Sequence, residues 1–274
     1  MSICTRLLAF LWLGLLALTN TAFAAKDTMV FCYEDTDIRP WQTRTGSGLS
    51  FDLLNEVSSR TNIKFSYVAR PWKRCLNEVK TNQVDGAIGV SWKADRLEIG
   101  VYPGGSSPDA NRAMHIERYV VIRKKGSAVN WDGHTFGKLD APVGTQFGYS
   151  SVDNLKALNI TVDDGARGAH ELLTKLKQDR IAAAVLLGGE AHSLFAENEV
   201  FRTDLEILAK PLVEKPYFLL LSHTLVKENT ALSETLWNTL SKAKQSPAYQ
   251  DKQKKAANRA KKSTRIGQLA PEHD

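Results

Sequence analysis

The strongest constraint on the fold is an alternation of strand-like and helix-like segments that begins near residue 28. Three runs rich in β-branched and aromatic residues, at 29–33, 63–68 and 84–90, are separated by two segments with helical spacing, at 49–60 and 71–79. A βαβαβ order of this kind predicts an α/β lobe whose sheet is largely parallel.

The two helical segments carry apolar faces. The first places Leu49, Leu53, Leu54 and Val57 on one broad face, with Ser50 as a candidate N-cap. The second has Pro71 at its expected first position, followed at spacings of three and four by Trp72, Cys75, Leu76 and Val79. Both helices should therefore cover a sheet.

A second run of the same kind follows. Its expected strands are 119–122, 141–147, 181–187 and 217–222, and its expected helices are 150–158, 169–176 and 232–240. No flexible linker separates the runs, so we expect two lobes, each with its own sheet, joined by strands near 119–123 and 210–216. This assigns 25–121 and 214–250 to lobe 1, 122–213 to lobe 2 and 251–274 to a basic C-terminal tail.

The N-terminus resembles a secretory signal. Arg6 precedes an uncharged apolar run at 7–18, and Ala22-Phe23-Ala24 follows. A transmembrane anchor would need about 20 apolar residues, more than this run supplies. We expect residues 1–24 to be removed and a soluble, monomeric protein to reach the periplasm.

The positive charge is uneven. The chain has a formal net charge of +6, but residues 251–274 carry seven basic and three acidic residues. No aromatic residue lies among these charges, so nucleic acid is not an expected partner. A solvated or frayed helical tail is the simpler interpretation, and contact with an anionic membrane surface is the alternative.

Motifs for common catalytic and metal sites are missing. The sequence has no His-Glu-x-x-His, Gly-x-Ser-x-Gly, Cys-x-x-Cys or phosphate-binding glycine loop, and its six histidines are scattered. We therefore expect no catalytic residue, metal or cofactor, and binding is favoured over catalysis.

Several short segments occur in an order typical of one family. These are Pro40-Trp41, Gly48-Leu49-Ser50-Phe51-Asp52-Leu53, Val84-Asp85-Gly86, Ser91-Trp92-Lys93-Ala94-Asp95-Arg96 and Gly148-Tyr149-Ser150. Over residues 28–250 the chain resembles bacterial periplasmic solute-binding proteins of family 3, the polar amino-acid type that serves ABC transporters. The resemblance implies an α/β, two-lobed Venus-flytrap fold with two hinge strands.

The resemblance and the chemistry together suggest a ligand site. A ligand carboxylate favours a guanidinium and free helix N-terminal amides, which Arg96 and the segment Gly148, Tyr149, Ser150 and Ser151 can supply from opposite lobes. Trp41 and Trp72 are candidate apolar walls, and Ser91 precedes the arginine segment. Core packing for the tryptophans and a surface ion pair for Arg96 are the competing interpretations.

The chain departs from the family at one site position. Amino-acid binders have an aspartate for the ligand's α-amino group where this chain has Leu187, and Glu190 or Asp35 are possible replacements. Otherwise the ligand need not be an α-amino acid. The segment 104–118 is also longer than the family's usual connection.

Two functional classes follow. The first is capture of a small amino-acid-like or organic-acid ligand for presentation to an ABC permease or a membrane sensor. The second is a dehydratase-like periplasmic enzyme on the same fold, with a Glu or Lys in the cleft moving a proton. Fold alone does not separate them.

Cys32 and Cys75 would remain after export, and an even pair in an oxidising compartment is a disulfide candidate, although two buried free thiols are possible. In the family's sheet order the first strand lies between the second and third. The helix that joins those two then crosses the first strand, which brings Cys75 near Cys32. The sequence and the resemblance together predict a disulfide.

Overall fold

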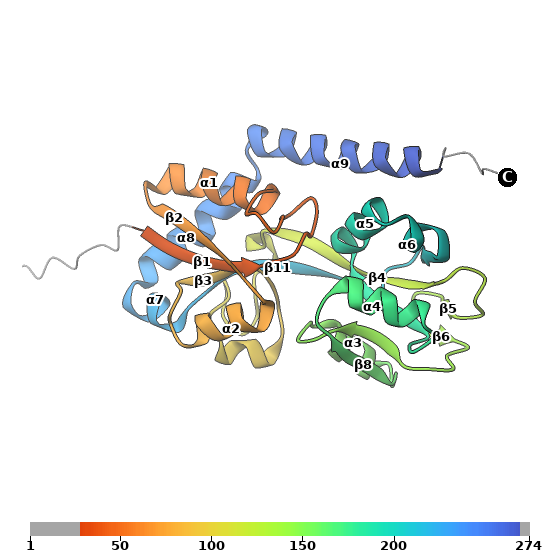
Figure 1. Ribbon diagram of the computed structural model, residues 1–274. Coiled ribbons are helices and arrows are strands. Elements are labelled where there is room, and N and C mark those ends of the chain that lie inside the picture. The colour runs from red at the N-terminus through yellow and green to blue at the C-terminus, as the bar shows by residue number, and fades with distance from the viewer. Residues whose placement is uncertain (1–27, 269–274) are drawn as a thin grey trace, which may run out of the picture.

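The structure is a computed structural model that describes residues 28–268, with side chains described as far as Arg259. The predicted signal peptide therefore lies outside the described residues. The chain forms two α/β halves that lie side by side, and two long strands run from one half to the other (Figure 1).

The first half is built on three parallel strands. They are β1 (Thr28–Glu34), β2 (Lys64–Arg70) and β3 (Gly86–Ser91), in the order β2-β1-β3. Its helices are α1 (Leu49–Thr61), α2 (Trp72–Lys80), α7 (His223–Glu228) and α8 (Thr230–Lys244). The predicted position of the first strand, between the second and third, is confirmed.

Alternation along β1 explains how these helices pack. Met29, Phe31 and Tyr33 belong to a core shared with α1 and α8, whereas Cys32 belongs to a second core that contains α2. Successive side chains of a strand point to opposite faces, so one strand contributes to both cores. The sheet of the first half is thus covered on both faces.

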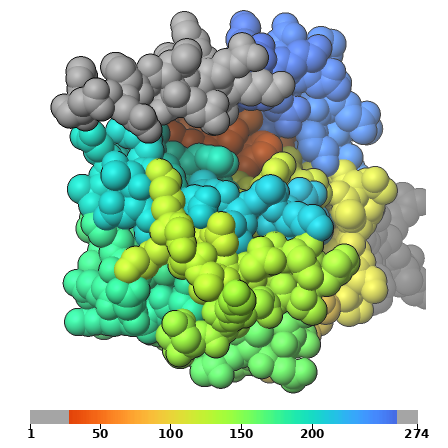
Figure 2. Space-filling model, turned by 90° about the vertical axis from the view of Figure 1, so that its right-hand side faces the viewer, coloured from red at the N-terminus to blue at the C-terminus, as the bar shows by residue number. Residues whose placement is uncertain are grey.

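The second half repeats the plan. Its strands β7 (Val143–Gln146), β8 (Val162–Ala166) and β9 (Ala183–Leu187) are parallel to one another, and the short β10 (Leu205–Ile207) pairs with β4. Its helices are α3 (Ser151–Ala157), α4 (Ala169–Lys177), α5 (Gly188–Glu197) and α6 (Glu199–Asp204). In Figure 2 the hairpin of β5 (Asn130–Trp131) and β6 (Phe136–Gly137) lies against the segment leading to β11, where Trp131 Nε1 donates to Pro211 O.

Strands β4 (His115–Lys124) and β11 (Val213–Leu221) connect the halves. They pair antiparallel from Tyr119↔Val213 to His115↔Tyr217, while β11 also pairs with β3 and β4 with β9. The hydrogen bonds consequently run unbroken through one nine-stranded sheet. Each half keeps its own parallel strands, and the two crossing strands join them into one sheet because both are long enough to pair with strands of either half. The lobe boundaries given above stay a prediction.

The last helix, α9 (Pro247–Gln268), starts on the first half and extends over the second (Figure 1). Tyr249 is buried in the core of α1 and α8, and Lys252 pairs with Asp52. The described part of the basic tail is therefore helical and anchored at its start. Within the described residues, no helix has the length and apolar character needed to cross a bilayer.

Two predicted helix starts differ in detail. Ser50 is the second residue of α1 rather than its cap, which is Gly48 at a φ of 116°. A Cβ at Gly48 would lie 2.6 Å from Trp41 O, so close backbone packing and the positive φ both require glycine there. Pro71 is the N-cap of α2, one residue before the expected position.

The disulfide between Cys32 and Cys75 is confirmed, with a Cα–Cα distance of 5.6 Å. Both cysteines are fully buried. The bond ties the middle of β1 to α2, the helix that carries Trp72.

We expect the Cys32→Ala/Cys75→Ala variant to lose about 3–4 kcal/mol of unfolding free energy. The bridge spans 43 residues, and closing a loop of that size restricts the unfolded chain. Urea unfolding of both proteins measures the difference. If the wild-type cysteines react with an alkylating agent before reduction, the bridge is absent and the expectation fails.

Candidate ligand-binding site

A small cavity lies between the two halves, with walls from both and from the crossing strands. Its volume is about 30 Å³. The cavity is lined by Glu34, Ile38, Trp41, Gln42, Trp72, Ile88, Gly89, Ser91, Arg96, His115, Glu117, Tyr119, Tyr149, Leu187 and Tyr217. Six of these residues have an aromatic ring, counting the imidazole of His115, and three carry a carboxyl or guanidinium group. A space of this size holds a water or two, so a larger ligand requires the halves to separate.

The crossing strands provide one wall. His115, Glu117 and Tyr119 alternate along β4 and face the cavity, while Ile116 between them is 53% exposed. The imidazole of His115 stacks between Trp41, at 4.1 Å, and Tyr217, at 5.4 Å, with interplanar angles near 10°. Burial, followed by the charge of Lys244, lowers the pKa of His115 to about 3, so this imidazole is neutral.

Arg96 also lines the cavity and connects the halves. Its Nη1 donates to Ser91 O at 2.7 Å and to Ser91 Oγ at 2.9 Å, and its Nη2 donates to Gly148 O at 3.2 Å. The guanidinium also lies 5.5 Å from the ring of Trp72. With 3% exposure the side chain is buried, and its charge is placed against the cavity by both halves.

Glu34, the last residue of β1, joins the halves as well. Its Oε2 accepts a hydrogen bond of 2.5 Å from the hydroxyl of Tyr149. Burial outweighs this hydrogen bond and raises the pKa of Glu34 to about 7. Glu34 is half-buried and is part of the cavity lining.

Two more carboxyls are buried nearby. Glu117 accepts from the backbone N–H of Arg118 at 2.7 Å, and burial raises its pKa to about 7. Glu190 on α5 accepts from Gln146 Nε2 at 3.1 Å and from Thr36 Oγ1 at 3.3 Å. Burial, then the charge of Glu34, raises the pKa of Glu190 to about 8.

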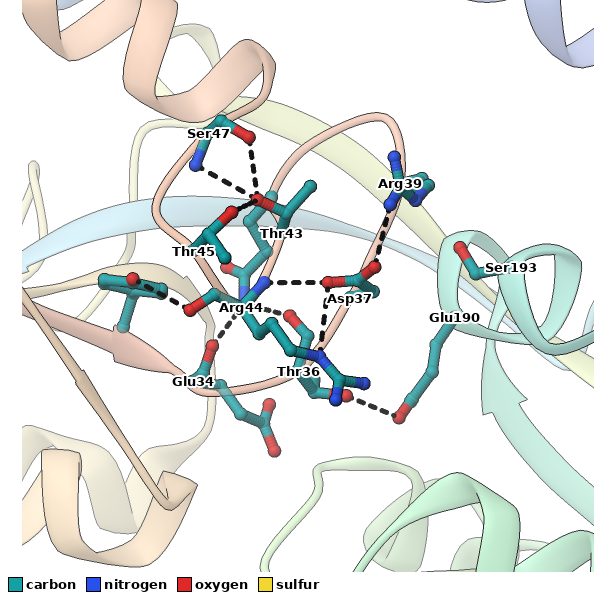
Figure 3. Close-up of polar contacts among 12 residues, drawn as sticks. Glu34, Thr36, Asp37, Arg39, Thr43, Arg44, Thr45, Ser47, Glu190 and Ser193 are labelled. Carbon is teal, nitrogen blue, oxygen red and sulfur yellow. Dashed lines mark hydrogen bonds and ion pairs between the residues drawn. The ribbon is translucent and has the colours of Figure 1, made fainter. Parts of the chain in front are cut away.

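The Thr36–Glu190 bond is a further contact between the halves (Figure 3). Figure 3 also shows how the loop after β1 is held: Asp37 accepts from Arg39 and from the backbone of Arg44. The loop therefore presents Thr36 to α5 from a fixed position.

The structure brings most of the predicted site residues together. Trp41, Trp72, Ser91, Arg96 and Tyr149 line the cavity. Four other predicted residues do not line the cavity but form hydrogen bonds next to it. They are Gly148, Ser150, Ser151 and Glu190. Ser150 Oγ and Ser91 Oγ are 2.9 Å apart, whereas Ser151 Oγ bonds Thr145. The predicted residue that lies elsewhere is Asp35, which is exposed and outside the lining.

Sequence reasoning missed the acidic residues of the cavity. Glu34 is one position before Asp35, and Glu117 lies in the long segment that the sequence analysis did not assign to a strand. The residues at 115, 117 and 119 face the cavity, but the segment His-Ile-Glu-Arg-Tyr does not alternate between apolar and polar residues, so it gave no local signal of a strand face. Leu187 does line the cavity, as the family position implied.

The described residues have the two-lobed periplasmic-binding-protein fold. No family model and no curated protein matches the sequence. Among solved structures, the chain is similar to an ancestral arginine-binding protein bound to glutamine, with 18% identity and a TM-score of 0.65 over 84% of this chain and 98% of that one.

Two further structures are similar at the same level. The ligand-binding core of GluR0 from Nostoc punctiforme, in complex with L-glutamate, has 18% identity and a TM-score of 0.62 over 83% of this chain and 98% of that one. The ancestral amino acid-binding protein AncCDT-1, a precursor of cyclohexadienyl dehydratase, has 17% identity and a TM-score of 0.62 over 84% and 95%. Identities this low establish the fold.

The buried carboxyls predict how stability depends on pH. A carboxyl whose pKa is higher in the folded state keeps its proton on folding, so stability falls as pH rises from its unfolded pKa to its folded one. Glu34, Glu117 and Glu190 have folded pKa values of about 7, 7 and 8. Below about pH 6.5 the buried His115 acts in the opposite direction, because the unfolded histidine takes up a proton there.

We therefore expect the unfolding free energy to fall between pH 6.5 and 8, by up to about 1.4 kcal/mol per pH unit for each carboxyl still protonated. Urea unfolding across this range measures the slope, and Glu190→Gln should reduce it. A flat profile in the wild type, or the same slope in Glu190→Gln, would show that these carboxyls are already ionised in the folded protein.

Proposed function

We propose that the protein is a solute-binding protein that encloses a small, polar, amine-bearing ligand between its two halves, with no catalysis. The observation that carries the proposal is the cavity that both halves line around a buried guanidinium, two carboxyls and six aromatic rings. Convergent polar groups in an aromatic-lined space between domains are the usual form of a small-molecule site. The ligand-bound proteins with this fold described above support it.

The charges of the cavity favour a ligand with a positive group. Glu34 and Glu117 are two acids against one fixed cation, Arg96. The elevated pKa of each acid reflects burial that the neighbouring cation, Arg96 for Glu34 and Arg118 for Glu117, offsets only in part. A ligand ammonium would supply the missing charge, and aromatic faces attract cations as well. The ligand carboxylate of an amino-acid-like molecule would then face Arg96.

The setting of the proposed function is transport or sensing. We propose that the chain is exported to the periplasm by its N-terminal segment and presents its ligand to an ABC permease or a membrane sensor. A thermal-shift screen of residues 25–274 with amino acids, polyamines and organic acids tests the ligand class. Mass spectrometry of the recovered compound then separates binding from catalysis, since a bound ligand returns unchanged.

Glu34→Gln and Asp35→Asn form a matched pair of variants. We expect Glu34→Gln to weaken binding of an amine-bearing hit at least 10-fold, about 1.4 kcal/mol, because it removes the charge that meets the ammonium. Asp35→Asn should bind like the wild type, since Asp35 is exposed outside the cavity. Calorimetry compares the three proteins, and equal affinities for both variants would contradict the assignment of Glu34.

Arg96→Ala should also weaken binding, by roughly 2–5 kcal/mol if the guanidinium pairs with a ligand carboxylate. Replacing the ligand carboxylate by a neutral amide should lower affinity for the wild type and change little for the variant. If both ligand forms bind the wild type equally, Arg96 holds the two halves together without contacting the ligand charge.

A further inference from the structure

A second cavity opens at the side of the same interface and shares no lining residue with the first. Its volume is about 540 Å³, compared with about 30 Å³ for the first cavity. Its walls come from the segment after β3 in the first half, from α3 in the second half and from β11 between them. It is large enough for a small organic molecule.

Strand pairing explains why this space exists. Strand β3 pairs with β11 from Ser91↔Tyr217 onward, whereas residues 213–216 of β11 pair with β4 on their other edge. After Ser91 the chain turns away, so nothing in the described sheet pairs with the near edge of β11 at Lys215 and Pro216. The cavity occupies this edge.

The two lysines of the lining differ in how they are paired. Lys215 and Lys93 line the cavity together with Asp153. Lys93 is paired with Asp95 at 2.9 Å and with Asp153 at 3.3 Å, so these two acids offset its charge. The ammonium of Lys215, in contrast, donates to Ser150 O over a long 3.4 Å. Burial, then the nearby Arg96, lowers the pKa of Lys215 to about 8.

The rest of the wall is largely apolar. Trp92 is 40% exposed, which is unusual for so large an apolar side chain, and Pro216 and Phe218 also belong to the lining. The exposed indole gives a ligand ring a surface to pack on.

We propose that this cavity is a second binding site, for a small aromatic carboxylate. The carboxylate would pair with Lys215, whose ammonium is half-buried and weakly bonded. The ring would pack on the exposed indole of Trp92. Because both halves form the wall, such a ligand would contact them simultaneously.

The test uses benzoate as the probe. Residues 25–274 are titrated at pH 7 while ¹H–¹⁵N spectra record the tryptophan indole signals, assigned with Trp92→Phe. We expect the Trp92 signal to shift in a saturable way, while those of Trp41 and Trp72, in the first cavity, stay in place. The spectra thus report where the probe binds as well as whether it binds.

Variants then test the contacts. Lys215→Met, which keeps most of the side-chain bulk, should weaken the probe at least 10-fold. The matched control Lys227→Met, at an exposed lysine of α7, should bind like the wild type. Benzyl alcohol, which lacks the carboxylate, should bind at least 10-fold more weakly than the probe. No saturable Trp92 shift at millimolar probe, a shift confined to Trp41 or Trp72, or full affinity in Lys215→Met would overturn the proposal.

Discussion

The antiparallel pairing of β4 with β11 is the interaction on which the rest of the structure depends. These strands hold the two halves in one sheet, and their alternating side chains place His115, Glu117 and Tyr217 in the space between them. A one-residue shift in this register would turn those side chains to the outer face, where Ile116 now lies. The register therefore fixes the composition of the cavity as well as the connection between the halves.

Closure of the halves buries charge, and this has a cost that a ligand can offset. Arg96 and Glu34 reach across the interface to the carbonyl of Gly148 and the hydroxyl of Tyr149, so the guanidinium and the carboxyl are held by neutral partners. Neutral hydrogen bonds compensate desolvation of an ion less well than an opposite charge does. A zwitterionic ligand would bring an opposite charge to each group, which would favour the closed arrangement by differential binding.

The sequence predicted the fold well because its signals are local. Helical periodicity and apolar runs located α1, α2, α4, β1 and β9, and the resemblance supplied the strand order that made the disulfide between Cys32 and Cys75 predictable. The site was predicted less completely. Trp41, Trp72 and Arg96 follow recognisable segments, but Glu34 and Glu117 depend on which way a strand residue points where the halves meet. That direction is set by long-range pairing, which a local pattern does not contain.

The central claim is that a ligand lies between the halves, with its positive group at Glu34. A crystal structure of residues 25–274 with the compound that most raises the melting temperature tests it most directly. We expect a nitrogen of the ligand within hydrogen-bond distance of Glu34, with the ligand in contact with both halves and enclosed by Trp41, Trp72 and Tyr149. A ligand bound to the outer surface, or one that leaves the carboxyl of Glu34 facing only solvent, would contradict it.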